Sequence, residues 1–183
     1  MSKEIYISKL NRENAEEALE VFKRTVPYAF EKEGLKHLTE DINNEVMHKK
    51  SLINDALNSK DLDILFLTAK LDDKIIGTIS YGPVGEDIRN CTDGDLDKVG
   101  EIGSLFVLPE YQGMGVATKL ISAMISELNK KDIERFCLDS GYRTAQKIWT
   151  KKFGAPYKTV KDYWGPGSIH MVWLCSTESF KIK

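Results

Sequence analysis

The residues best suited to chemistry lie in one stretch of the chain, from Glu101 to Leu120. Glu101 precedes an apolar run, Ile102 to Leu108, that has the character of a β-strand. A turn at Pro109 leads to Gln112-Gly-Met-Gly115, and apolar residues at helical spacing follow. A helix start presents unpaired backbone N–H groups and the positive end of the helix dipole. The order of strand, glycine loop and helix therefore predicts a site for a phosphate or pyrophosphate.

Two common phosphate-binding motifs agree less well with this stretch. A dinucleotide fingerprint is suggested by Gly113 and Gly115, and Asp139 lies near the expected place of a ribose-binding acid. However, Thr118 stands where that fingerprint has its third glycine or alanine, and the turn from Pro109 separates the glycines from their strand. A P-loop is excluded because no Gly-Lys-Ser/Thr follows.

The elements predicted around the stretch indicate the fold class. Two hairpins and a strand–helix–strand unit favour a mixed, largely antiparallel sheet flanked by helices, in which the strands at 102–108 and 135–139 are parallel. The predicted elements are a strand at 5–10, a helix at 14–26 that Pro27 ends or kinks, a helix at 39–57, a hairpin at 64–81, a polar loop at 86–97, a helix at 116–128, a helix from Ser140 to Phe153, and a hairpin at 157–175.

The segment from Val107 to Ala117 resembles the acetyl-CoA-binding motif of the GNAT N-acetyltransferases, Gln/Arg-x-x-Gly-x-Gly/Ala. Gln112, Gly115 and Ala117 fill the fixed positions, and the preceding Pro-Glu-Tyr is typical of the family. The resemblance implies a GNAT-like twisted sheet of six to seven strands with splayed central parallel strands.

Acetyl-CoA is the cofactor that the resemblance implies. Backbone groups of Leu105, Phe106 and Val107 would pair with its pantetheine arm. Trp149 takes the place of a tyrosine that many members of the family carry near the CoA sulfur. The amides that would hold the pyrophosphate are those of Gln112, Gly113, Met114, Gly115, Val116, Ala117 and Thr118.

Catalysis would need a base for the acceptor amine and an acid for the CoA thiolate. Glu101 stands eleven positions before Gln112, where histone acetyltransferases and some ribosomal-protein N-terminal acetyltransferases carry a catalytic glutamate. The alternative is a solvated glutamate at the strand start. Tyr142 or Tyr163 could supply the proton to sulfur, or the thiolate could leave unaided. For Tyr142, however, an ordinary packed helix residue is the favoured interpretation.

Aromatic and acidic residues elsewhere could line the acceptor pocket, since such a lining suits a cationic amine. His170 could also act as a second base, although a packed strand residue is the favoured interpretation. The acidic 86–97 loop could steer the substrate or be an ordinary surface loop. The predicted acceptor-binding residues are Tyr28, Phe30, Tyr81, Asp139, Tyr163, Trp164 and His170.

Composition narrows the remaining choices. The 183 residues suit one domain spanning 1–183, and 26 basic against 28 acidic side chains give a net charge of -2, with no basic excess for nucleic acid or a membrane surface. Three separated cysteines and the absence of a signal-like start predict a cytoplasmic protein. No metal site is expected. Cys137 is predicted to be a buried core thiol, and an exposed edge of the late hairpin could pair with a second copy.

The sequence thus predicts an acetyl-CoA-dependent acyltransferase that moves an acetyl group directly to a primary amine of a small molecule, amino acid or peptide. Two alternatives stay open. One is a catalytically weak acyl-CoA sensor, because the usual tyrosine is replaced by Trp149. The other, ranked far behind, is a nicotinamide-dependent reductase.

Overall fold

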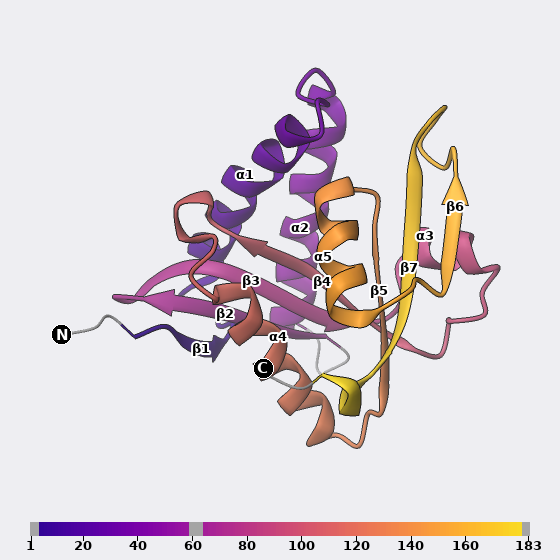
Figure 1. The fold of residues 1–183 in the computed structure, drawn as a ribbon. Helices are drawn as coiled ribbons and strands as arrows, with labels where there is room; N and C mark the ends of the chain where they lie inside the picture. Colours follow the sequence, from indigo (N-terminus) through magenta and orange to yellow (C-terminus); the bar gives the residue numbers. More distant parts are fainter. Residues whose placement is uncertain (1–3, 59–63, 181–183) are drawn as a thin grey trace. The chain divides into compact units, whose positions relative to one another are not determined.

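The computed structural model describes residues 4–58 and 64–180, and these ranges contain seven β-strands, five α-helices and two short 3₁₀ helices (Figure 1). In chain order they are β1 (Tyr6–Lys9), α1 (Ala15–Lys32), α2 (Thr39–Asn58), β2 (Leu65–Leu71), β3 (Lys74–Gly82), α3 (Glu86–Thr92), β4 (Gly100–Val107), η1 (Pro109–Tyr111), α4 (Val116–Asn129), β5 (Arg135–Ser140), α5 (Arg143–Phe153), β6 (Lys158–Lys161), β7 (Ile169–Ser176) and η2 (Thr177–Ser179).

The strands form a single sheet in the order β1-β2-β3-β4-β5-β7-β6. β1 pairs antiparallel with β2, and β7 pairs antiparallel with both β5 and β6. β4 and β5 are parallel, as expected for two strands joined by the helix α4. The predicted fold class, a mixed and largely antiparallel sheet flanked by helices, is confirmed.

The parallel ladder is short. It joins Gly100 to Phe136 and Glu101 to Cys137, although Ile102 and Gly103 still have strand conformation. The end of the ladder beside Glu101 agrees with the predicted splaying of the two central strands.

Contacts divide the chain into two compact units, residues 1–80 with 104–124 and residues 81–103 with 125–183. The strands β3 and β4 and the helix α4 each pass from one unit to the other along the sequence. The single domain expected from the sequence therefore stays a prediction, and each unit is described by itself.

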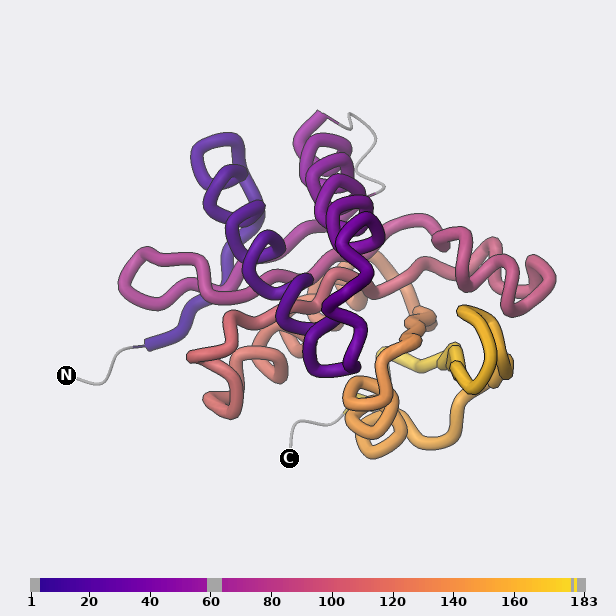
Figure 2. Tube along the Cα trace, turned by 90° about the horizontal axis from the view of Figure 1, so that it is seen from above, coloured from indigo at the N-terminus to yellow at the C-terminus, as the bar shows by residue number. Residues whose placement is uncertain are grey.

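The first unit has its core beneath two neighbouring helices. α1 and α2 lie side by side in both views (Figures 1 and 2). Phe22 is fully buried at the centre of this core and meets the rings of Phe66 and Phe106 edge-on. The other buried members are Ala18, Leu19, Val21, Val26, Ile53, Ile75 and Leu108.

The second unit has a smaller core beneath α3. This short helix packs against β5, β6 and β7 (Figure 1). The buried members of the core are Val84, Ile88, Cys91, Leu96, Cys137 and Val172.

The predicted end of the helix at Pro27 is wrong, while the alternative, a kink at this residue, stays a prediction. α1 continues through Pro27 to Lys32, and Pro27 lies inside it. Phe30, in the last turn, packs against the core of the first unit, so burial offsets the hydrogen bond that Pro27 cannot donate.

The predicted polar loop at 86–97 is wrong in its first half, where the chain forms α3. Glu86 and Asp87 stand in its first turn, a favourable place for acids, and Ile88 and Cys91 are buried beneath it. The helix therefore owes its position to two buried apolar residues within an otherwise polar segment.

Two boundaries near the end of the chain also differ from the prediction. α5 begins after Tyr142 rather than at Ser140, because Ser140 ends β5 and its hydroxyl accepts the N–H of Tyr142. Tyr163 and Trp164 lie in the turn after β6 and not in the strand.

Candidate active site

In the first unit, β4 leads into a tightly held turn. The Leu108 N–H donates to the Ile76 carbonyl at 2.9 Å, and the Gln112 side-chain amide donates to the Val107 carbonyl at 3.1 Å. The first side chain of the predicted cofactor motif thus closes the turn between strand and glycines.

The two glycines of the motif have left-handed backbone conformation, with φ of 80° at Gly113 and 79° at Gly115. Glycine adopts this conformation without steric cost. A Cβ at either position would meet no heavy atom within 4 Å, so the space over the loop is open and a side chain would protrude into it. α4 begins at Val116, and its first turn bonds Lys119 N–H to the Gly115 carbonyl.

An open glycine loop followed by a helix start fits a pyrophosphate. The first backbone N–H groups of a helix have no acceptor within the helix. They and the positive end of the helix dipole favour an anion at the helix N-terminus. The residues from Gln112 to Thr118, whose amides form the predicted pyrophosphate cradle, therefore comprise this loop and the first turn of α4. Met114 is 52% exposed within the loop and could cover part of a ligand.

Gly77 on β3 brings the helix start close to the sheet. A Cβ there would lie 3.0 Å from the Phe106 carbonyl oxygen and 3.2 Å from side-chain atoms of Val116 and Leu120. Gly77 belongs to none of the sequence motifs, although a glycine within an apolar strand often marks such a close approach.

Two further contacts hold the turn that precedes the glycines. Arg24 of α1 makes a two-pronged ion pair with Glu110, with both N–O distances 3.0 Å, and this hydrogen bonding lowers the pKa of Glu110. The Lys74 ammonium lies 5.9 Å from the centre of the Tyr111 ring.

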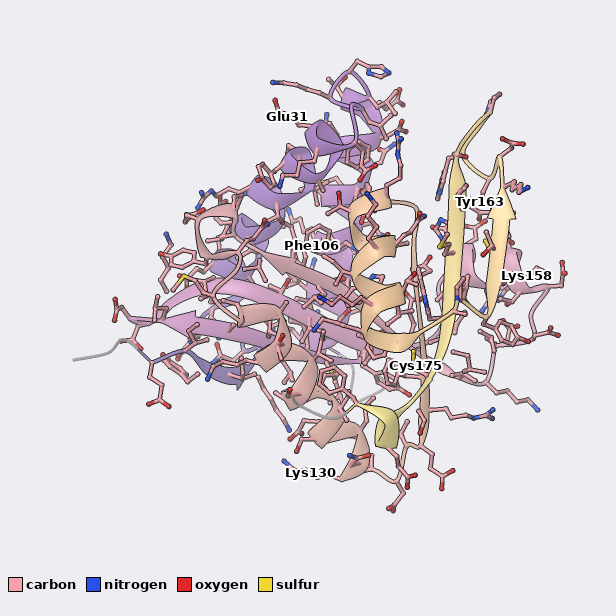
Figure 3. All side chains as sticks on the ribbon, in the orientation of Figure 1. Glu31, Phe106, Lys130, Lys158, Tyr163 and Cys175 are labelled. Atoms are coloured by element: carbon pink, nitrogen blue, oxygen red, sulfur yellow. The ribbon has the colours of Figure 1, made fainter. Side chains whose placement is uncertain are left out.

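The end of β4 carries the predicted pantetheine-binding segment. Ser104, just before it, is buried with a φ of 51°, and its carbonyl accepts the Thr78 hydroxyl at 2.9 Å. A non-glycine residue in this conformation is uncommon and marks an irregularity in the strand. Leu105, Phe106 and Val107 follow it and are half-buried; Phe106 is labelled in Figure 3. The sequence offered no sign of the irregular residue.

In the second unit, Glu101 is half-buried beside Cys137 in the parallel ladder. Its Oε2 accepts the backbone N–H of Gly85 at 2.7 Å. This hydrogen bond fixes the position of one carboxylate oxygen. The predicted base is therefore fixed in place by the backbone at the start of α3.

Tyr81 packs directly over Gly100. A Cβ at position 100 would lie 2.0 Å from the Tyr81 hydroxyl oxygen, so only glycine fits there. Burial, followed by the nearby Cys137 thiol, raises the pKa of Tyr81. Cys137 itself is fully buried, and burial raises its pKa, which agrees with its prediction as a core thiol.

Four of the predicted acceptor-binding residues form one connected group. The Trp164 indole N–H donates to Nδ1 of His170 at 3.0 Å, and Nε2 of His170 lies 2.8 Å from the Asp139 carboxylate. The Tyr163 ring packs against both Trp164 and His170, with ring centres 4.8 and 5.0 Å apart, and its hydroxyl donates to Asp87. Tyr163 is labelled in Figure 3 on the hairpin turn.

The candidate acids differ in their surroundings. Burial and the hydrogen bond to Asp87 raise the pKa of Tyr163 to about 12, which makes it a poor proton donor. Tyr142 precedes α5 and is half-buried. Trp149 is half-buried on α5, with its ring centre 5.9 Å from that of Phe153.

Gln146, which the sequence analysis did not single out, is a buried polar residue on α5. Its side-chain amide donates to the carbonyls of Ser140 and Ile169 at 2.9 and 2.7 Å, and so ties the helix to the ends of β5 and β7. A buried glutamine between Ala145 and the exposed Lys147 gives no recognisable sequence signal.

The predicted residues thus fall into separate groups. The cradle residues, with Leu105 to Val107, lie in the first unit, as do Tyr28 and Phe30 on α1. Glu101, Tyr81, Tyr142 and Trp149, together with the Asp139 group, lie in the second unit.

Within residues 4–58 and 64–180, no cluster of three or more His, Cys, Asp or Glu side chains is placed to hold a metal ion. No helix in these ranges is both long and apolar enough to cross a membrane.

The sequence profile of the acetyltransferase (GNAT) family matches residues 19–155. The chain belongs to this family. Membership confirms the resemblance to the GNAT enzymes and acetyl-CoA as the predicted cofactor. A comparison with curated protein sequences finds no significant match.

Solved GNAT structures share the fold at low sequence identity. The PaiA N-acetyltransferase from Thermoplasma acidophilum, in complex with coenzyme A, is 20% identical, with a TM-score of 0.67 over 94% of this chain and 99% of that one. The ribosomal-protein-S18-alanine N-acetyltransferase from Escherichia coli is 14% identical, with a TM-score of 0.63 over 98% and 97%. A GNAT acetyltransferase from Staphylococcus aureus Mu50 is 15% identical, with a TM-score of 0.60 over 95% and 99%.

Proposed function

We propose that this GNAT protein transfers the acetyl group of acetyl-CoA directly to a primary amine, carried by a small molecule, an amino acid or a peptide. The observation that carries the proposal is the open loop formed by Gly113 and Gly115 in left-handed conformation, directly before the start of α4. This is the cradle that a pyrophosphate requires.

The cofactor would be held by two parts of the first unit. The amides from Gln112 to Thr118 would bind its pyrophosphate, and backbone groups of Leu105 to Val107 would pair with its pantetheine arm. Trp149 is a further candidate contact. Bound acetyl-CoA supplies an activated acetyl thioester. A backbone N–H near Phe106 or Val107 is the proposed donor to its carbonyl oxygen.

Glu101 is the proposed general base. A protonated amine has no lone pair for attack, and an alkyl ammonium has a pKa near roughly 10.4, so a proton must be taken up at neutral pH. The ionised carboxylate of Glu101, held by the Gly85 N–H, can accept it. Tyr142 is the proposed donor to the departing sulfur, because burial and the hydrogen bond to Asp87 raise the pKa of the alternative, Tyr163, to about 12.

The acceptor would bind near the aromatic and acidic residues of the second unit. Asp139 and the rings of Tyr163, Trp164 and His170 form one group, to which Tyr81 is a proposed addition. Tyr28 and Phe30 of α1 are further proposed contacts. A homodimer and a cytoplasmic location stay proposals as well.

The first test compares ligands by thermal shift. We expect acetyl-CoA to raise the melting temperature more than NAD does, and longer acyl-CoAs to report the chain-length preference. A larger shift with NAD than with any CoA ester would overturn the proposal. Release of CoA from acetyl-CoA is then measured across a panel of amines.

The Glu101→Gln variant separates transfer from binding. The amide can still accept the Gly85 N–H but cannot take up a proton, so we expect turnover to fall by roughly 10²-fold or more with unchanged CoA affinity. Turnover equal to that of the wild type would exclude Glu101 as the base. Equal CoA binding with no turnover in either protein would favour the acyl-CoA sensor.

A further inference from the structure

The hydrogen bonds around His170 fix its protonation state. The indole N–H of Trp164 is only a donor, so Nδ1 of His170 must be an acceptor. The ring proton then resides on Nε2, which donates to Asp139 Oδ2 at 2.8 Å. His170 is 3% exposed, and both ring nitrogens are occupied. It is therefore a neutral link between Trp164 and Asp139 and not a second base.

The link is held rigidly from the turn side. The Asp162 N–H donates to the Ser168 carbonyl at 2.7 Å, and the Trp164 N–H donates to the Ser168 hydroxyl at 2.9 Å. The Asp162 carboxylate accepts the Gly167 N–H. Trp164 is consequently fixed in orientation although it is 60% exposed.

The backbone leaves space for this link. A Cβ at Gly141 would lie 2.9 Å from the indole nitrogen of Trp164 and 3.3 Å from Nδ1 of His170. Any side chain at position 141 would therefore crowd the hydrogen bond between the two rings. The absence of a side chain at Gly141, just after β5, therefore leaves the space that the Trp164 indole occupies.

The arrangement leaves one oxygen of Asp139 available. The Asp139 side chain is 20% exposed, and its Oδ2 is engaged by His170. Within residues 4–58 and 64–180, no side chain or backbone group donates to Oδ1 of Asp139. Asp139 shares one face of β5 with Cys137, whose partner in the parallel ladder is Glu101. Asp139 stands two positions along β5 from Cys137 and Glu101 lies directly across the ladder from it, and after burial the charges of both carboxylates raise the pKa of the Cys137 thiol.

We propose that Asp139 is the residue that selects a cationic amine, and that His170 and Trp164 are positioning residues that aim it. Oδ1 of Asp139 accepts a hydrogen bond from the ammonium of the acceptor, while Glu101 takes up the proton. The neutral His170 holds the carboxylate by its other oxygen without cancelling its charge. This inference rests on the proposed acetyl transfer to an amine.

The test is steady-state kinetics with the best amine of the panel. Asp139→Asn keeps size but removes the charge, so we expect the KM for the amine to rise roughly tenfold or more while the KM for acetyl-CoA stays unchanged. Asp132→Asn is the matched control, because Asp132 is exposed and asparagine tolerates its left-handed backbone.

Two further variants address positioning. Trp164→Phe removes the N–H and retains an aromatic ring, and we expect the amine KM to rise about threefold with kcat nearly constant. His170→Gln retains a donor to Asp139, so it should keep more amine affinity than His170→Leu. Nitrogen NMR of the wild type should show His170 with its proton on Nε2, and Trp164→Phe should alter the Nδ1 signal.

The outcomes separate the two proposals. If the wild type acetylates an amine and Asp139→Asn leaves its KM unchanged, the role of Asp139 is wrong and the proposed function stands. If the NMR spectrum shows a doubly protonated His170, the positioning role is wrong. Should Asp139→Asn fail to fold, Trp164→Phe carries the same test. If the wild type acetylates no amine, both proposals fall.

Discussion

At the scale of single residues, an ion pair on α2 shows how the second helix is fastened to the acetyltransferase fold. The Lys49 ammonium lies 3.0 Å from Glu45 and 5.8 Å from the centre of the Phe106 ring, and the Lys49 side chain is only 12% exposed. Phe106 belongs to the proposed pantetheine-binding segment. The pair therefore lies against a strand that must hold its shape for the cofactor.

The pair predicts a pH dependence of stability. Burial by itself raises the pKa of Glu45, but hydrogen bonds from His48 and Lys49 and the Lys49 charge outweigh it and lower the pKa to about 2. The pKa of Glu45 in the folded protein lies below its unfolded value of about 4.3. The ionised carboxylate therefore makes its full contribution to the free energy of unfolding above that pH, and this contribution is lost as the pH falls towards 2.

We expect Glu45→Gln to lower the free energy of unfolding by about 1 kcal/mol at pH 7. The full shift of the Glu45 pKa would correspond to roughly 3 kcal/mol, and we expect a smaller effect because Glu45 is partly exposed and water screens the interaction. Urea titrations should show this difference fall to less than about half near pH 3. Glu31→Gln, which breaks the exposed pair with Lys36, is the control and should change little. A difference that is constant with pH would contradict this account.

At the scale of elements, the start of α4 depends on the small size of Gly77. A methyl group there meets the Phe106 carbonyl oxygen at 3.0 Å, a backbone atom that cannot rotate away, and side chains of Val116 and Leu120 at 3.2 Å. The helix start, and with it the cradle amides, would have to move by a few tenths of an ångström.

We expect Gly77→Ala to weaken CoA binding by about three- to tenfold, because the proposed cradle depends on close approach of its backbone amides to the pyrophosphate. Overpacking should also lower the free energy of unfolding by about 1–3 kcal/mol. Calorimetric titration with CoA and urea unfolding measure the two effects separately. Lower stability with unchanged CoA affinity would show that the contact serves packing alone.

Elements with strong local signals could be predicted from the sequence. The β2–β3 hairpin follows from Asp72 and Asp73, which adopt φ values of 50° and 63°, as a tight hairpin turn requires. The glycine loop before α4 follows from Gly113, Gly115 and the helical spacing after them, and its role as a pyrophosphate cradle stays a proposal. The sequence did not indicate α3 because its two buried apolar residues stand in a polar segment rich in acids, and α1 passes Pro27 because tertiary packing outweighs the local cost.

The sequence indicated which residues could line the site better than it indicated how these residues are hydrogen-bonded to one another. Asp139, Trp164 and His170 were each singled out by residue type. Their hydrogen bonds depend on the register of β5 against β7 and on the shape of the turn at 162–168, and neither is encoded within a short segment. The role of His170 as a neutral link therefore needed the structure.

For the whole molecule, the family profile and the fold both indicate a GNAT acetyltransferase, but neither identifies the acceptor substrate. The chain covers nearly the full length of GNAT structures that differ from it in more than three quarters of their residues. Such a fold supports many acceptors, so specificity must lie in particular side chains. The group around Asp139 is the part of this chain that we assign to that task.

The most direct test of acetyl transfer is mass spectrometry of a reaction that contains the protein, acetyl-CoA and the amine panel. We predict one N-acetylated amine for each CoA released, with the protein itself unmodified, because the proposed transfer is direct and Cys137 is buried. Release of CoA with free acetate as the only acetyl product, or an acetyl group retained on the protein with no acetylated amine, would contradict the account.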